Sequence, residues 1–181
     1  MKKKSEKKKK LESIPKINRR LFRLWSEAVR DRAMLKCEYC KIENKAINVN
    51  GVSTKLDSHH LISRKVKDLP LKFDINNGIC LCPICHKWGI PSFHRDPITT
   101  ITWLMKNSPE RYNYVLNNVN FRVDLDNRQV LEEIEKRLIV KESLDIKKLK
   151  EIEAQFPREQ KKARPTKTLF DEEKSSSSSS D

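Results

Sequence analysis

The 181-residue sequence has no apolar run approaching the ~18–20 residues that a transmembrane helix needs. No apolar segment follows the N-terminal lysines either, so a secretory signal is not expected. These absences predict a protein without membrane contact, located in the cytoplasm.

Apolar residues are scarce, at 36% of the sequence against about 45–50% in typical globular domains. Residues 2–10 hold seven lysines and one glutamate, and residues 175–181 are six serines and an aspartate. Such segments cannot offset the entropy lost on ordering. We therefore expect a disordered basic arm over residues 1–15 and a disordered tail over residues 161–181.

The formal net charge is +14, of which residues 2–10 supply +6 (7 − 1), leaving about +8 for the rest. A basic body with a lysine arm suits a polyanion, because each neutralised phosphate releases condensed counterions. The arm alone fits a role in solubility or localisation equally well. Nucleic acid is the partner that the charge favours.

Five cysteines form a cluster whose odd number favours metal ligation over disulfides. Cys37 and Cys40 form one Cys-x-x-Cys pair, and Cys82 and Cys85 form a second after 41 intervening residues. Four thiolates satisfy tetrahedral zinc, so the two pairs predict a structural zinc site. Cys80 is left over among apolar neighbours and is interpreted as a buried small residue.

Hydrophobic periodicity predicts several helices around a small β element. An amphipathic helix is expected over residues 16–36, followed by a β-hairpin over residues 47–60 that turns at Asn50-Gly51. A second strand is expected around 79–81, and a helix from Pro83.

Further helices should begin after Asp96 and Ser108, each a good N-cap before proline. The first is expected to bury Ile98, Ile101 and Met105, and the second Tyr112 and Val115. Helical patterns over 128–139 and 144–155 each carry one narrow apolar stripe. These two helices should pack as a hairpin on the core or pair between subunits.

The histidines stand in a specific order relative to the cysteines. Ser58-His59-His60-Leu61-Ile62 is followed by Asn77, and His86 comes directly after the second cysteine pair. This pattern resembles the HNH endonuclease family, of the phage type, over about residues 37–94. The resemblance implies an α+β fold with a small ββα-metal core, a structural zinc held by four cysteines, and flanking α-helices. The nuclease domain would span residues 16–119, and residues 120–160 would be a helical extension.

The resemblance also implies a role for each residue of the motif. His59, His86 and His94 would hold one catalytic divalent cation, which could be magnesium, manganese, nickel or zinc. His94 precedes a proline as in relatives, but a short insertion containing Gly89 and Pro91 displaces it. His60 would be the general base, and Asn77 would position the loop that carries it.

Other side chains near the motif have less specific interpretations. Arg64, Lys65 and Arg95 flank the histidines and would contact DNA phosphates, although solvated surface charges are an equally good interpretation. Asp57 is a candidate acceptor for a histidine N–H group. Trp88 and Trp103 lie in helical apolar patterns and are expected in the core.

The function implied is metal-dependent hydrolysis of phosphodiester bonds in DNA within a bacterial or phage-infected cell. One alternative is a zinc-stabilised nucleic-acid-binding module that does not cleave. Another is an accessory protein of a phage packaging or recombination machine, with other phage or DNA-processing proteins as partners. The target, the choice between nicking and double-strand cleavage, and the oligomeric state stay open.

Overall fold

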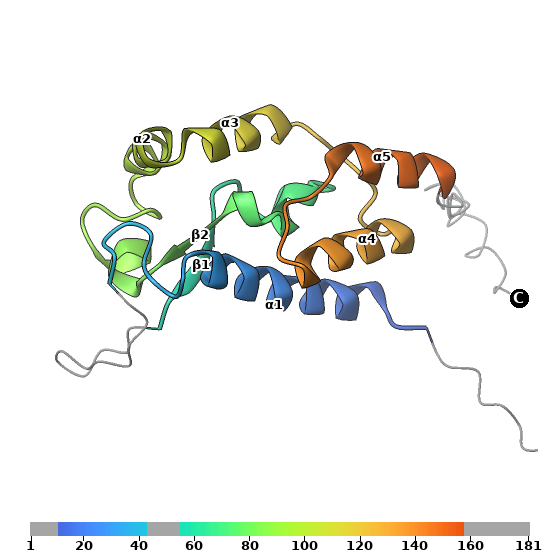
Figure 1. Cartoon of the computed structure of the whole chain (residues 1–181), viewed down its shortest axis with the longest axis horizontal. Coiled ribbons are helices and arrows are strands. Elements are labelled where there is room, and N and C mark those ends of the chain that lie inside the picture. Colours follow the sequence, from blue (N-terminus) through green and yellow to red (C-terminus); the bar gives the residue numbers. More distant parts are fainter. Residues whose placement is uncertain (1–10, 43–54, 158–181) are drawn as a thin grey trace, which may run out of the picture.

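The computed structural model describes residues 11–42 and 55–157, where five α-helices surround a two-stranded sheet (Figure 1). The predicted α+β class, with helices flanking a small β element, is confirmed. Most of the expected basic arm and all of the expected tail lie outside the described residues. None of the described helices is long and apolar enough to cross a membrane.

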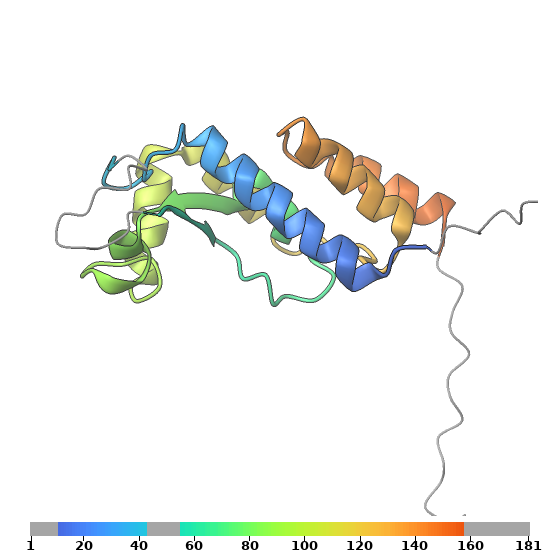
Figure 2. The same cartoon turned by 90° about the horizontal axis from the view of Figure 1, so that it is seen from below.

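Helix α1, Ile14–Arg32, packs against both strands of the sheet and extends beyond them (Figure 2), and one face of the helix is buried. Pro15 occupies its first turn, where a missing N–H is tolerated. The helix ends earlier than the expected residue 36 because Met34 and Leu35 take positive φ angles of 51° and 53° and turn the chain toward the first cysteine pair. Residues three or four positions apart line its buried face: Ile17, Leu21, Trp25, Ala28 and Val29.

Strand β1, Asp57–His60, pairs antiparallel with β2, Gly78–Leu81, so that His59 lies opposite Ile79. The expected Asn50-Gly51 turn lies outside the described residues, and within them the partner of β1 is β2. Gly78 lies under α1, where an added Cβ would be 2.3 Å from Val29 Cγ2. Glycine at this position therefore allows the helix to approach the sheet closely.

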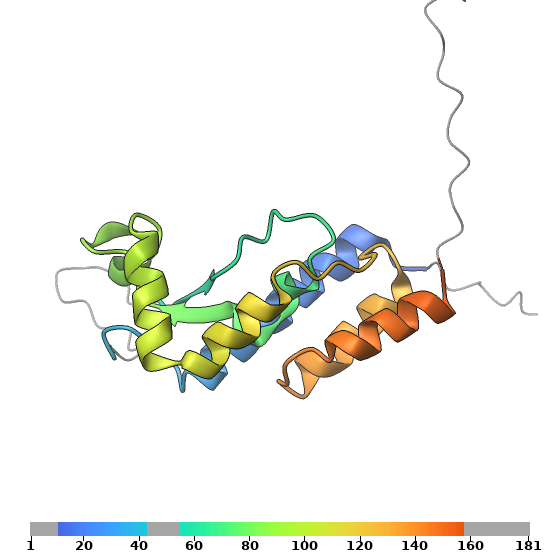
Figure 3. The same cartoon turned by 90° about the horizontal axis from the view of Figure 1, so that it is seen from above.

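Helix α2, Pro97–Asn107, and α3, Pro109–Asn118, follow each other, and α3 lies on the side of the sheet opposite α1 (Figures 1 and 3). The expectation that Ile98, Ile101 and Met105 are buried is wrong, because their side chains are 76%, 50% and 51% exposed. The opposite face of α2 packs inward instead, with Leu104 buried and Trp103 in contact with two aromatic rings.

Helix α4, Arg128–Ile139, and α5, Ile146–Gln155, form a hairpin on the core, and Figure 2 shows α4 alongside α1. Val130, Ile134 and Leu138 are buried on one face of α4 at the spacing that the sequence predicts. Arg20 on α1 makes two hydrogen bonds to Glu135 on α4, of 2.6 and 2.9 Å. The helical hairpin thus braces the helix that supports the sheet.

Candidate active site and zinc site

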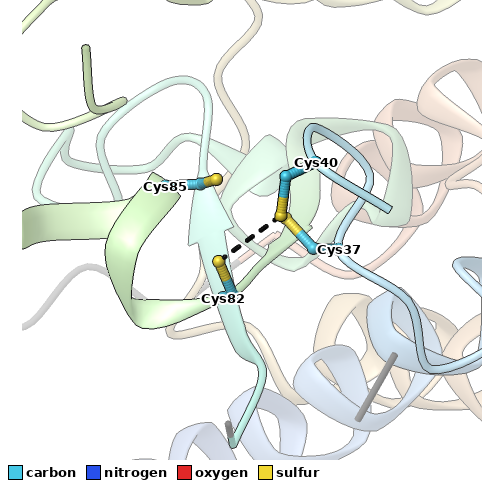
Figure 4. Close-up of side chains that lie close together, drawn as sticks. All are labelled: Cys37, Cys40, Cys82 and Cys85. Atoms are coloured by element: carbon cyan, nitrogen blue, oxygen red, sulfur yellow. Dashed lines mark hydrogen bonds between the residues drawn. The ribbon is translucent and has the colours of Figure 1, made fainter. Parts of the chain in front are cut away.

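The four cysteines converge as the sequence predicts, with all four sulfurs within 4.8 Å of one another (Figure 4). The Sγ atoms of Cys40 and Cys82 are 3.7 Å apart. In a tetrahedral site with Zn–S bonds of about 2.3 Å, neighbouring sulfurs lie about 3.8 Å apart. The donor set and this spacing fit a structural zinc ion.

Each cysteine pair is positioned by a tight turn. The first turn is closed by the Lys41 N–H, which donates to the Cys37 carbonyl at 2.8 Å. The second pair starts where β2 ends, and the His86 N–H donates to the Cys82 carbonyl at 2.9 Å. Cys80 is fully buried, and burial together with the nearby Glu38 carboxylate raises the pKa of its thiol to about 12. It stays a thiol, as expected of a small core residue.

Three of the four histidines bring one nitrogen each to a common point. His86 Nε2 is 3.1 Å from His59 Nδ1 and 3.1 Å from His94 Nε2. With metal–nitrogen bonds of about 2.1 Å, ligands at right angles lie about 3.0 Å apart. The three nitrogens therefore have the spacing of ligands on one face of a divalent cation.

Asp57 determines which nitrogen of His86 is available to a cation. The Asp57 carboxylate accepts a hydrogen bond of 2.9 Å from His86 Nδ1. Because a carboxylate can only accept, Nδ1 carries the proton and Nε2 presents a lone pair. This is the carboxylate–histidine arrangement that orients metal ligands, as the sequence suggests for Asp57.

The environment favours the neutral form of His59 and of His86. Burial, reinforced by His86 and His94, lowers the pKa of His59 to about 3. Burial also lowers the pKa of His86, although the Asp57 carboxylate opposes this effect. Neutral imidazoles are the form that ligates metals, so the lowered pKa values of His59 and His86 favour cation binding at neutral pH.

His60 follows His59 in β1 but faces α1. Its ring stacks on Trp25, with centroids 3.8 Å apart, and meets the edge of Phe22 at 6.1 Å. Its Nε2–H donates to the Lys72 carbonyl at 2.9 Å, and because a carbonyl can only accept, Nδ1 is left with the lone pair. Burial lowers the pKa of His60, which favours this neutral form.

Asn77 closes the loop that joins the two strands. Its Oδ1 accepts from the Ile62 N–H at 2.7 Å, and its Nδ2 donates to the carbonyls of Ile62 and Leu71 at 3.1 and 3.0 Å. The side chain is fully buried. It therefore holds the chain after His60 in a fixed position, in line with the positioning role that the resemblance implies.

The three basic residues expected to contact phosphates are all exposed. The Arg64 guanidinium lies 5.7 Å from the centroid of the Phe22 ring, on the His60 side of the site. Arg95 follows His94, and Lys65 lies in the connecting loop. The interpretation of Trp88 as a core residue is wrong, because this side chain is 70% exposed, whereas Trp103 packs against the core.

Sequence reasoning missed two residues that support the site. Trp25 lies within the helix expected over residues 16–36, and nothing in the sequence indicates that it would contact a histidine. Glu38 lies inside the first cysteine pair, where its carboxylate accepts from Arg32, Arg111 and the Cys80 N–H at 2.8–2.9 Å. The only sequence signal for this role of Glu38 is that an acidic residue lies between the two cysteines of the first pair in a basic chain.

Comparison with known families agrees with this geometry. Residues 37–88 match the family model described as HNH endonuclease. No curated protein and no solved structure matches the chain. The matched segment contains all four zinc-site cysteines together with His59, His60, Asn77 and His86, while His94 lies beyond its end. Residues 37–88 are therefore similar to the HNH endonuclease domain, a domain of nucleases.

Proposed function

We propose that the protein is a DNA endonuclease that hydrolyses phosphodiester bonds with one divalent cation and a histidine general base. One observation carries the proposal: adjacent histidines of one strand have different environments. His59 joins two other imidazoles at a common point, and His60 is held apart with its Nδ1 lone pair available. Hydrolysis of a phosphodiester needs this division between a cation site and a base.

The residues divide the chemistry as follows. When bound at His59, His86 and His94, the cation would stabilise charge on the phosphate and on the leaving 3′-oxygen. His60 Nδ1 takes a proton from a water molecule, whose oxygen attacks the phosphorus while the bond to the 3′-oxygen breaks. The Lys72 carbonyl then stabilises the resulting imidazolium, because it accepts the Nε2 hydrogen bond.

Charge supports DNA as the substrate. The sequence has a formal net charge of +14, and exposed Arg64, Lys65 and Arg95 stand close to the histidines in the chain. Each would neutralise one phosphate and add affinity that is independent of base sequence. The phage-type setting and partners in DNA processing rest on the family resemblance alone.

The test is cleavage of supercoiled plasmid by wild type and by His60→Ala, with EDTA or with added magnesium, manganese or nickel. We expect metal-dependent nicking or linearisation by wild type and a rate lower by about a hundred- to ten-thousandfold in the variant. Added imidazole should restore part of the lost rate, because it replaces the base. Lys67→Ala, an exposed change in the connecting loop, serves as the matched control.

Binding measurements separate this proposal from its main alternative. His60→Ala should bind plasmid as tightly as wild type, because His60 is not expected to contribute to phosphate binding. A wild-type protein that binds DNA but leaves it intact with every metal would instead be the zinc-stabilised binding module.

A further inference from the structure

The segment between His86 and His94 is a closed loop that projects from the metal cluster. The Phe93 N–H donates to the Cys85 carbonyl at 3.0 Å, and the His94 N–H donates to the His86 carbonyl at 3.2 Å. Both stems of the loop therefore carry candidate metal ligands. The loop lies at one end of the described fold, beyond the end of β2 (Figures 2 and 3).

The tip of this loop is apolar and exposed. The Trp88 side chain is 70% exposed and Ile90 is 92% exposed, whereas Trp25 in the core is 3% exposed. Gly89 joins them in a turn so tight that an added Cβ would be 2.9 Å from the Ile84 carbonyl oxygen. Large apolar side chains grouped on a protein surface are typical of an interaction site.

The position of the tip indicates what covers it. Trp88 is two residues from His86, so their Cα atoms are at most about 7.6 Å apart. A polynucleotide with its scissile phosphate at the histidine cluster would therefore lie within reach of the tip. Lys87, between His86 and Trp88, is exposed and adds a positive charge for a neighbouring phosphate.

We propose that Trp88 and Ile90 form a wedge that inserts at a base step beside the scissile phosphate and contacts the faces of the bases. This inference rests on the proposed nuclease function and adds the part of DNA that the site recognises. Apolar wedges of this kind unstack a base step and bend the duplex, and aromatic side chains stack on bases of any sequence. The wedge would open the groove next to the phosphate that is cut.

The test uses the full chain carrying His60→Ala, so that DNA is bound without being cut. A fluorescent duplex reports affinity by anisotropy, and 2-aminopurine placed at the step that wild type cleaves reports unstacking. We expect Trp88→Ala to weaken binding about tenfold to a hundredfold, as for loss of one stacked base, and to abolish the rise in 2-aminopurine emission. Trp88→Phe should retain most of both effects. Ile101→Ser, an exposed apolar change on α2, is the matched control.

Salt dependence distinguishes the wedge from charge contacts. Trp88→Ala should leave the slope of log affinity against log salt concentration unchanged, whereas Lys87→Ala should reduce it by about one. Tryptophan emission adds a direct readout, because acrylamide should quench Trp88 less in the complex than in the free protein.

Each outcome decides the inference. If wild type binds and cuts DNA while Trp88→Ala behaves like Ile101→Ser and Trp88 stays open to acrylamide, the wedge is wrong and the nuclease stands. A protein partner would then be the better occupant of the tip. If wild type neither binds nor cuts DNA, both the wedge and the proposed function are overturned.

Discussion

The His60 imidazole lies flat on the Trp25 indole, with centroids 3.8 Å apart and ring planes within 16° of parallel. Trp25 is itself fixed, because its Nε1–H donates to the Asp74 carbonyl at 2.9 Å. Helix α1 therefore supplies one wall of the proposed base site, although it lies wholly before the segment that matches the HNH family. The orientation of the base depends on packing between these two parts of the chain.

Replacing Trp25 should affect both stability and chemistry. Trp25→Ala removes a buried aromatic side chain and should lower the free energy of unfolding by about 3–5 kcal/mol. Trp25→Leu should be more stable than Trp25→Ala. Without the indole, however, the His60 ring is more exposed to solvent, and its lowered pKa moves back toward the ordinary value of histidine. We expect the acidic limb of the pH–rate profile of Trp25→Leu to shift to higher pH. An unchanged limb would mean that Trp25 has only a structural role, and Leu116→Ala on the surface is the control.

The bond between Asp57 and His86 should govern affinity for the catalytic cation. Asp57→Asn replaces the carboxylate with a weaker acceptor, so His86 loses its preferred orientation and proton position. We expect affinity for manganese or nickel to fall about tenfold to a hundredfold, measured by titration calorimetry. Asp68→Asn, in the connecting loop, makes the same chemical change away from the histidines and should bind metal like wild type. Equal affinities for the two variants would contradict the role of Asp57.

Glu38 should hold the zinc site to the rest of the fold. Burial disfavours its charge, but Arg111 and Arg32 outweigh this and lower the pKa of the Glu38 carboxyl. Glu38→Gln leaves two arginines with an uncharged partner, one of them almost fully buried, and should cost about 3–5 kcal/mol in urea unfolding. Glu110→Gln, on the surface of α3, should cost almost nothing. A Glu38→Gln protein as stable as wild type would show that the ion pairs are dispensable.

Acid should destabilise the protein through the histidine cluster. The ordinary pKa of histidine is 6.5 and that of His59 in the folded chain is about 3, so below pH 6.5 only the unfolded chain binds this proton. Stability therefore falls as pH drops, and His59 accounts for about 2 kcal/mol between pH 6.5 and 5. Chemical unfolding without added catalytic metal should show a shallower pH dependence for His59→Asn. The zinc thiolates contribute equally to both proteins and cancel in the difference, so parallel curves would contradict the prediction.

Removing zinc should unfold the cysteine region first. The site ties the turn after α1 to the end of β2, and structural zinc binding is coupled to folding. We expect a strong chelator, or Cys82→Ser, to cause loss of hydrogen-exchange protection in β2 while α4 and α5 keep much of theirs. Cys80→Ser is the matched control, because it leaves all four sulfurs in place. Full protection of β2 in chelator would contradict a structural zinc.

Some features were predictable because neighbouring residues encode them. Two Cys-x-x-Cys pairs supply the four thiolates of a tetrahedral zinc site, whatever the fold of the rest of the chain. The apolar stripe of Val130, Ile134 and Leu138 was enough to predict α4, because helical periodicity is a local property. The order of His59, His60, Asn77 and His86 likewise carried the family resemblance, which the match over residues 37–88 confirms.

Other features depended on contacts between distant segments. Helix α2 has apolar residues on two faces, and the buried face is the one with Leu104 and with Trp103, which contacts the Phe93 ring. Trp25 and Trp88 are both tryptophans within expected helices, yet the first lies under His60 and the second lies in solvent. The sequence by itself determined the pairs of cysteines, the order of the histidines, and the main helices and their order. Tertiary structure decided which apolar face is buried and which side of His60 is available, because burial depends on the surface that each element meets.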